Sequence, residues 1–520
     1  MMSTCKPFLE KGNKSSHSIL NAKQKNLLVI LLLLLLCLIL RLVNYIGVGI
    51  NDDIAYIQNA RSLAQGYNPI SSGFNQLGFR LGMVAPLSLF YKLFGFNNIA
   101  FSSYPLICSL ITCALIYLTA VRLWGRSAAI FASLLWIAYP LQIVFDTQLS
   151  PSNQQATCVV AALFFYFYSI KDRTSAKFDF LSKSREPVLL ILSGIFLGFG
   201  WWLNELFVTF ILVVLPFLLL VRPKIKHLLW VIAGFLIIIF LELLIVKIST
   251  GSWLARFYCI LKTEAAVVSN KNPEYLPRTL FKVFNANPLY DEGHFGIIWY
   301  LFVIVSTSAL LLKQKLILAL ALGCWLWLGY LQWGVQSFNL TPITKYIRYI
   351  SMVVPIQCLA FGAILGHFLK FSKKLNIFII FLFILLLIHL SWLGTKAVNT
   401  VKIHTEDFRE IAGFFSNLEL QHDDIIYTDD LTANFVEIYS KGNLSIQRLN
   451  NFQVLNPPKK GFLVAYGSRY IIEQPGYRRA LPEWFLYPPP AHWPLLYTIR
   501  GKQVGVYQVF DPKIYKILPK

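Results

Sequence analysis

Residues 26–45 read NLLVILLLLLLCLILRLVNY, an apolar run of 20 residues in which Arg41 is the only charged side chain. An α-helix rises about 1.5 Å per residue, so roughly 20 residues cross a hydrocarbon core of about 30 Å. This stretch therefore predicts a transmembrane helix. Lysines precede it and a small-residue cleavage site is absent, so we expect a retained signal anchor behind a cytoplasmic tail of residues 1–25.

Ten further apolar runs of similar length follow this first one. They cover residues 101–121, 127–145, 154–170, 188–203, 205–221, 228–248, 295–312, 316–333, 348–369 and 375–393. Together the runs predict an all-α polytopic membrane domain of about 11 transmembrane helices within residues 26–393.

The composition of the whole chain agrees with this class. Its 520 residues are 56% hydrophobic and 14% charged, whereas an ordinary soluble domain has about 25% charged residues. These values exclude a soluble globular protein and a disordered one. A net charge of +22 would suggest nucleic acid in a soluble chain, but here the Lys and Arg residues flank the apolar runs, so no nucleic-acid partner is expected.

The distribution of basic residues predicts the orientation. Short, basic loops connect alternate runs at residues 122–126, 171–187, 222–227, 313–315 and 370–374. Cytoplasmic loops of membrane proteins are enriched in Lys and Arg. We therefore expect a multi-pass protein of the cell (inner) membrane with a cytoplasmic N-terminus, long outside loops at 46–100 and 249–294, and an extracytoplasmic domain at 394–520.

The region after residue 394 has the pattern of a small α/β domain. Short β-prone runs occur at 425–428, 444–449 and 461–466, and residues 431–440 have helical spacing. Two closing runs, 495–500 and 504–510, flank a Gly-Lys pair and predict a β-hairpin.

The first outside loop contains an acidic pair, Asp52 and Asp53, followed by an apolar stripe at helical spacing that stops at Gly66. An aspartate at a helix start caps unpaired N–H groups and is stabilised by the helix dipole. Alternatively, a carboxylate kept ionised there can act as a general base on a hydroxyl at the bilayer surface. Because there are two carboxylates, both interpretations can hold at once.

Other charged side chains are candidates for substrate binding. Arg80 and Arg348 can each pair with a lipid phosphate through a guanidinium fork, or serve as interfacial anchors. Lys345 and Tyr349 cluster with Arg348 at the outer end of the tenth run, where phosphate or sugar binding competes with anchoring. Glu242 lies inside an apolar run, and its spacing permits pairing with Lys247.

No metal or cofactor site is predicted. The eight cysteines lack Cys-x-x-Cys spacing, and no nucleotide-binding or zinc-protease motif occurs. The sequence leaves a requirement for a divalent cation open.

Over roughly residues 26–400 the chain resembles the GT-C family of lipid-linked-sugar glycosyltransferases, particularly protein O-mannosyltransferases and the aminoarabinose transferases that modify lipid A. The strongest element is Asp52-Asp53-Ile54-Ala55-Tyr56 after the first run. Weaker likeness comes from Leu93-Phe94-Gly95, Gly194 with Gly198, Thr250-Gly251 and Arg348-Tyr349.

The resemblance implies transfer of a sugar, with inversion, from a polyprenyl phosphate to a glycan, lipid or protein acceptor on the extracytoplasmic face. It implies Asp52 as the catalytic base, with Asp53 in a supporting role and Tyr56 among the substrate-binding residues. The alternative is a transporter or flippase of a lipid-linked saccharide. Several partnered charges in mid-membrane would favour transport, whereas a single interfacial position of Glu242 would favour catalysis at one face.

Overall fold

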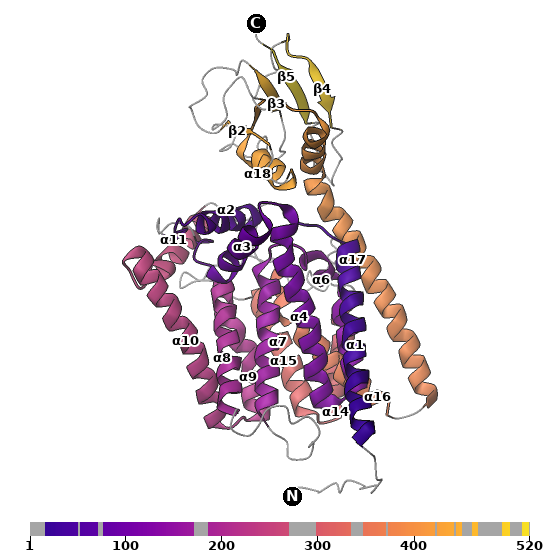
Figure 1. The fold of residues 1–520 in the computed structure, drawn as a ribbon. Helices are drawn as coiled ribbons and strands as arrows, with labels where there is room; N and C mark the ends of the chain where they lie inside the picture. Colours follow the sequence, from indigo (N-terminus) through magenta and orange to yellow (C-terminus); the bar gives the residue numbers. More distant parts are fainter. Residues whose placement is uncertain are drawn as a thin grey trace, which may run out of the picture.

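The structure, a computed structural model, consists of a helical bundle and a small α/β unit at one end of it (Figure 1). It describes residues 16–49, 52–70, 76–170, 186–269, 298–333, 347–370, 373–421, 424–440, 444–449, 460–465, 491–499 and 512–518.

The helices follow one another in the order expected from the apolar runs. They are α1 (Ser16–Val43), α2 (Asp52–Ala64), α3 (Leu81–Phe94), α4 (Asn98–Trp124), α5 (Arg126–Ala138), α6 (Pro140–Phe145), α7 (Pro151–Ser169), α8 (Glu186–Leu203), the 3-10 helix η2 (Glu205–Phe210), α9 (Ile211–Val221), α10 (Ile225–Thr250), α11 (Ala255–Ser269), α14 (Ile298–Leu311), α15 (Lys315–Trp333), the 3-10 helix η4 (Ile347–Val353), α16 (Val354–Phe368) and α17 (Lys373–Asn417).

Each of the 11 predicted runs contains helix, but some runs are broken. Pro140 separates α5 from α6 within the run 127–145, since proline lacks the N–H that would continue the helix. Among the described residues, six helical stretches are long and apolar enough to cross a membrane. The class of a multi-pass helical protein is therefore confirmed, whereas the count of 11 spans stays a prediction.

The centre of the bundle consists of α4, α5, α7 and α16, which pack against one another. Small residues allow the closest approach: a Cβ placed at Gly362 or Gly366 of α16 would collide with Ala128 of α5. Close packing of small residues is how helices associate in lipid, where burial from water contributes little. Peripheral helices such as α1, α10 and α17 instead keep rows of exposed leucine, isoleucine and phenylalanine, as lipid-facing helices do.

Two short helices, α2 and α3, lie across the end of the bundle that faces the α/β unit (Figure 1). The expected helix after the acidic pair is confirmed as α2, and Gly66 follows its end with a φ of +87° that favours glycine. The Leu93-Phe94-Gly95 stretch lies at the end of α3.

Among its described residues, the α/β unit has a five-stranded sheet of order β2-β1-β3-β5-β4. Its strands are β1 (Ile426–Thr428), β2 (Ile446–Arg448), β3 (Gly461–Ala465), β4 (Leu495–Thr498) and β5 (Lys513–Ile517), and its helix is α18 (Asp430–Tyr439). Strand β1 is parallel to β2 and β3, while β5 is antiparallel to β3 and β4. The predicted α/β character is therefore confirmed.

The first run of the predicted closing hairpin contains β4, whereas its second run, 504–510, lies outside the described residues, so the hairpin stays a prediction. Strand β4 pairs with β5, a strand that the sequence pattern did not predict. In addition, α17 continues without a break through position 394 to Asn417, so one helix joins the bundle to the α/β unit.

The α/β unit contacts the bundle through α18. Arg61 of α2 pairs with Glu437 of α18 at 2.7 Å. The hydroxyl of Tyr439 donates to the carbonyl of Val48 at 3.0 Å, just before the acidic pair. The ring of Phe435 stacks on Phe408 of α17 with centroids 4.5 Å apart. These contacts fix α18 above α2 (Figure 1).

Candidate functional site

The two aspartates at the start of α2 have different surroundings. Asp53 is 7% exposed, and its Oδ2 accepts hydrogen bonds from the backbone N–H groups of Gly49 at 2.8 Å and Leu149 at 3.4 Å. It therefore joins the segment after α1 to the segment before α7. Asp52 is only half-buried and lies in the same first helical turn.

Tyr56 connects the acidic pair to a cation. It lies four residues after Asp52, on the same face of α2, and its side chain is fully buried. Burial raises the pKa of Tyr56 to about 12, the Arg80 guanidinium opposes this shift, and the Asp52 carboxylate adds to it. The neutral Tyr56 hydroxyl accepts a hydrogen bond from Arg80 Nη1 at 2.5 Å.

Arg80, at the start of α3, is held by a carboxylate from a distant part of the chain. Its Nη2 lies 2.7 Å from Glu205 Oε1, and its Nε lies 3.3 Å from Glu205 Oε2, so the pair is bidentate. Gln76 Nε2 donates to the same Oε1 at 2.8 Å. Glu205 begins η2, more than a hundred residues further along.

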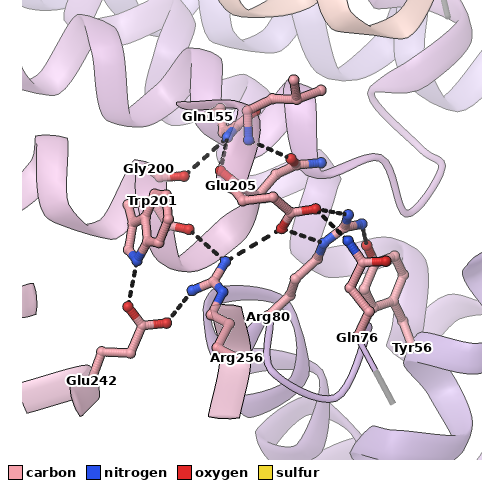
Figure 2. A network of polar contacts seen from close by, with 11 residues as sticks. Tyr56, Gln76, Arg80, Gln155, Gly200, Trp201, Glu205, Glu242 and Arg256 are labelled. Atoms are coloured by element: carbon pink, nitrogen blue, oxygen red, sulfur yellow. Dashed lines mark hydrogen bonds and ion pairs between the residues drawn. The ribbon is translucent and has the colours of Figure 1, made fainter. Parts of the chain in front are cut away.

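A second arginine reaches Glu205 from the opposite side (Figure 2). Arg256 of α11 is 3% exposed and donates from Nη2 to Glu205 Oε2 at 3.4 Å and to the carbonyl of Trp201 at 3.1 Å. Its Nη1 pairs with Glu242, which also accepts from the indole N–H of Trp201. The guanidinium carbon lies 4.6 Å from the Trp201 ring centroid, a cation–π contact.

We call Arg80, Glu205, Arg256 and Glu242 the arginine network. Its two cations balance its two carboxylates, which is the condition under which buried charges are tolerated. The four side chains come from the loop before α3, from η2, from α10 and from α11, and Figure 2 shows them converging.

One sequence-based interpretation is wrong here, and one member of the network was not singled out from the sequence. Arg256 of the second long loop is buried. Glu242 pairs with Arg256, whereas Lys247 donates to the carbonyl of Gly251. The sequence held a signal for this pair. A carboxylate in an apolar run needs a cation, and Arg256 follows Glu242 by 14 residues.

The second predicted cation cluster is described only in part. Lys345 and the side chain of Arg348 lie outside the described residues. Tyr349 lies in η4 against the bundle core, where its carbonyl accepts from the Trp327 indole at 3.4 Å. Their role in substrate binding therefore stays a prediction.

A further buried ion pair links α1 to the end of α6. Arg41 Nε lies 2.5 Å from Asp146 Oδ2, both side chains are fully buried, and the same guanidinium donates to the carbonyls of Trp136 and Ile137. Asn153 Nδ2 donates to Asp146 Oδ1 at 2.6 Å. All groups of the pair point into the protein, so we assign it a structural role. Sequence reasoning missed this pair.

Among the residues that the structure describes, no three His, Cys, Asp or Glu side chains group as a metal site would require.

Residues 83–246 match the family model described as dolichyl-phosphate-mannose-protein mannosyltransferase. No curated protein sequence matches the chain.

Two solved proteins are similar in fold. The apo crystal structure of ArnT from Cupriavidus metallidurans has a TM-score of 0.55 at 12% identity, covering 94% of this chain and 97% of that one. ArnT bound to undecaprenyl phosphate has a TM-score of 0.50 at 13% identity, with the same coverage. The Archaeoglobus fulgidus oligosaccharyltransferase tethered with an acceptor peptide has a TM-score of 0.51 at 11% identity, covering 85% of this chain and 69% of that one. The chain thus has the GT-C fold that the resemblance predicted.

Proposed function

We propose that the protein is an integral-membrane glycosyltransferase that moves a hexosyl or pentosyl group from a polyprenyl-phosphate donor to a glycan, lipid or protein acceptor on the extracytoplasmic face. The observation that carries the proposal is that Asp52 and Tyr56 lie four residues apart on one face of α2 while Tyr56 accepts a hydrogen bond from Arg80 of the arginine network, at one end of the bundle. The likeness in fold to ArnT, which was solved with undecaprenyl phosphate, supports this choice of donor.

Asp52 is the better base of the two aspartates. The Oδ2 of Asp53 already accepts from two backbone N–H groups, and hydrogen bonds to a carboxylate lower its basicity. Asp52 is the more exposed of the pair and lies in the first turn of α2. It can therefore take the proton of an acceptor hydroxyl while Asp53 holds the backbone around it.

The arginine network supplies positive charge for the departing phosphate. As the acceptor oxygen forms its bond to the anomeric carbon, the bond from that carbon to the phosphate oxygen breaks and the electron pair stays on the phosphate. Arg80 and Arg256 can stabilise this charge because each guanidinium presents several N–H donors. Attack opposite the leaving group inverts the anomeric carbon.

Glu205 contacts both guanidinium groups and so occupies the position that a phosphate would take between them. A phosphate binding there must displace at least one carboxylate–guanidinium contact. The exchange keeps both arginines paired before and after donor binding, which avoids an uncompensated buried charge.

The side of the reaction follows from the predicted topology. The acidic pair and the arginine network lie at the end of the bundle nearest the α/β unit, which the basic loops assign to the outside (Figure 1). An alkaline phosphatase fused after Lys520 should therefore be active. An inactive fusion, together with an active reporter fused in the loop 222–227, would overturn the orientation.

The flippase alternative gains no support. Glu242 lies in the last third of α10, and its cation comes from α11, beyond the end of that helix. This is the interfacial arrangement that favours catalysis at one face.

The direct test is to assay purified protein with a panel of polyprenyl-phosphate sugars and with extracted glycans, lipids and proteins as acceptors. We expect one labelled sugar to appear in one acceptor class with release of free polyprenyl phosphate. Movement of the intact lipid-linked sugar across vesicles without its cleavage would contradict the proposal.

A further inference from the structure

The first turn of α7 carries buried polar atoms that have no hydrogen-bond partner in the structure. They are both amide atoms of Gln154, Oδ1 of Asn153 and Oγ of Ser150, on residues that are 1%, 1% and 3% exposed. Buried polar groups in native proteins are almost always hydrogen-bonded. Such a concentration within five residues requires an explanation, and a bound ligand is one.

The residues that flank these atoms along the chain contact the two parts of the proposed site. Just before them, the N–H of Leu149 donates to Asp53. Just after them, Gln155 Nε2 donates at 3.0 Å to the carbonyl of Asn204, the residue before Glu205 (Figure 2). The start of α7 is therefore next to the acidic pair on one side and next to the residue before Glu205 on the other.

In the proposed reaction this is where the transferred sugar must be. Its anomeric carbon has to lie between the acceptor hydroxyl, which Asp52 deprotonates, and the phosphate, which Arg80 and Arg256 bind. A ring held in that position would present hydroxyl groups to the start of α7. A hydroxyl both donates and accepts, and a carboxamide such as that of Gln154 offers one group of each kind.

Neighbouring elements add groups of the same chemistry. The 3-10 helix η4 packs on α7 and carries Ser351, whose buried hydroxyl has no partner. Gln142 of α6, which also packs on η4, has two unpartnered amide atoms. All of these groups are uncharged.

The one acid close by along the chain does not change this character. Asp146 is paired with Arg41, and Asn153 donates to it through Nδ2. This bond fixes the Asn153 amide so that its Oδ1 remains available.

We propose that Gln154, together with Ser150 and Asn153, forms the subsite for the donor sugar and selects a neutral sugar rich in hydroxyls over one with an amino or carboxylate group. The inference rests on the proposed function and adds the substrate class. A carboxamide subsite provides no counter-charge for a charged sugar, whereas every hydroxyl of a neutral sugar can be paired there.

The test measures binding to the full-length protein of two lipids that differ only in the sugar: polyprenyl phosphate and polyprenyl-phosphate hexose. Gln154→Met keeps the side-chain length but removes both amide groups. We expect this variant to bind polyprenyl phosphate like the wild type and to lose affinity for the hexose lipid by about 10-fold, since each neutral hydrogen bond contributes about 2- to 10-fold.

The melting temperature without ligand distinguishes the subsite from a structural role of Gln154. If Gln154 serves the subsite, Gln154→Met should melt at the same or a higher temperature than the wild type, because it removes buried unpartnered groups. A structural role predicts a lower melting temperature. Thr119→Val is the matched control, since Thr119 of α4 also has a buried hydroxyl with no partner but lies toward the other end of the bundle. It should leave the binding of both lipids unchanged.

The outcomes separate the two proposals. A wild type that binds neither lipid would overturn the proposed function. A wild type that binds both, with a Gln154→Met variant that retains the preference for the hexose lipid or loses both lipids equally, would overturn only the subsite. If Gln154→Met does not fold, Gln154→Asn, which keeps the amide but withdraws it, should show the same selective loss.

Discussion

The acidic pair and the arginine network lie at the same end of the bundle and share Tyr56, yet they stabilise their carboxylates in different ways. Asp53 accepts from neutral backbone N–H groups of Gly49 and Leu149. Glu205 and Glu242 are instead paired with guanidinium groups. Backbone N–H groups thus support Asp53, whereas guanidinium groups support Glu205 and Glu242.

This difference fits two tasks in one reaction. A general base must keep a lone pair that can accept a proton, so neutral donors are suitable supports for its neighbour. A phosphate site must be positive when the donor arrives, and before then its charge must be compensated.

The largest effect is expected for Asp52→Asn. Asparagine is also a good N-cap, so the free energy of unfolding should change by less than about 1 kcal/mol. Transfer should fall about 10²- to 10⁴-fold, since the proton acceptor is lost. The variant should therefore show a much lower kcat at a nearly unchanged melting temperature.

The neighbouring position provides the comparison. Asp53→Asn should mainly lower the melting temperature, because Asp53 holds the backbone of Gly49 and Leu149. Near-full transfer by Asp52→Asn with an inactive, folded Asp53→Asn would move the base to Asp53. Full activity in both would remove the acidic pair from the mechanism.

A smaller loss of activity is expected when the guanidinium group of Arg80 or Arg256 is replaced by an ammonium group. Arg80→Lys and Arg256→Lys keep the charge balance but lose bidentate hydrogen bonds, each of which contributes about 1.5–3 kcal/mol when charged. Donor KM should rise about 10- to 100-fold. Lys92→Gln, an exposed cation on the same helix as Arg80, should leave KM unchanged.

Glu205→Gln is expected to change donor binding in the opposite direction. Removing this carboxylate leaves the two guanidinium groups with one fewer competitor for a phosphate. Binding of polyprenyl phosphate should tighten several-fold while the melting temperature falls, because a buried pair is broken. Weaker binding would show that Glu205 is needed to position the arginines and would contradict the exchange.

The α/β unit should affect the acidic pair through the Val48 carbonyl. Tyr439→Phe removes the hydrogen bond to this carbonyl, which contributes about 1 kcal/mol. We expect a few-fold lower kcat at unchanged donor KM. Tyr497→Phe is the matched control, since its hydroxyl bonds to Glu410 at an exposed position. Equal effects of both variants would indicate a general loss of stability.

The smallest effect on transfer is expected at Asp407 of α17. Burial raises the pKa of Asp407 to about 7, the carboxylates of Glu406 and Glu410 add to this, and hydrogen bonding to the N–H of Phe408 opposes it. In the unfolded chain the pKa is about 3.9. The folded state therefore binds the proton more tightly, and stability should fall as the pH rises from about 4 to 7.

Asp407→Asn should remove this pH dependence of the melting temperature and leave the transfer rate at constant pH unchanged. A melting temperature that falls just as much with pH in the variant would assign the dependence to another group.

The sequence alone determined the helical membrane class and the order of the helices. The length of an apolar run is a local property, and the transfer free energy of each residue adds to that of its neighbours. The acidic pair was found for a similar reason, since a helix start has a local pattern. The strands β1, β2 and β3 and the helix α18 followed from short-range spacing.

Only the tertiary structure decided which charges are paired. Arg80, Glu205, Glu242 and Arg256 are separated by up to 176 positions, from 80 to 256, and each had several possible partners in the sequence. The partner of a buried charge is fixed by the approach of helices through space, because the Coulomb energy depends on distance between side chains and not along the chain. For the same reason β5, and the different surroundings of Asp52 and Asp53, could not be read from residues 49–56 or 504–517 alone.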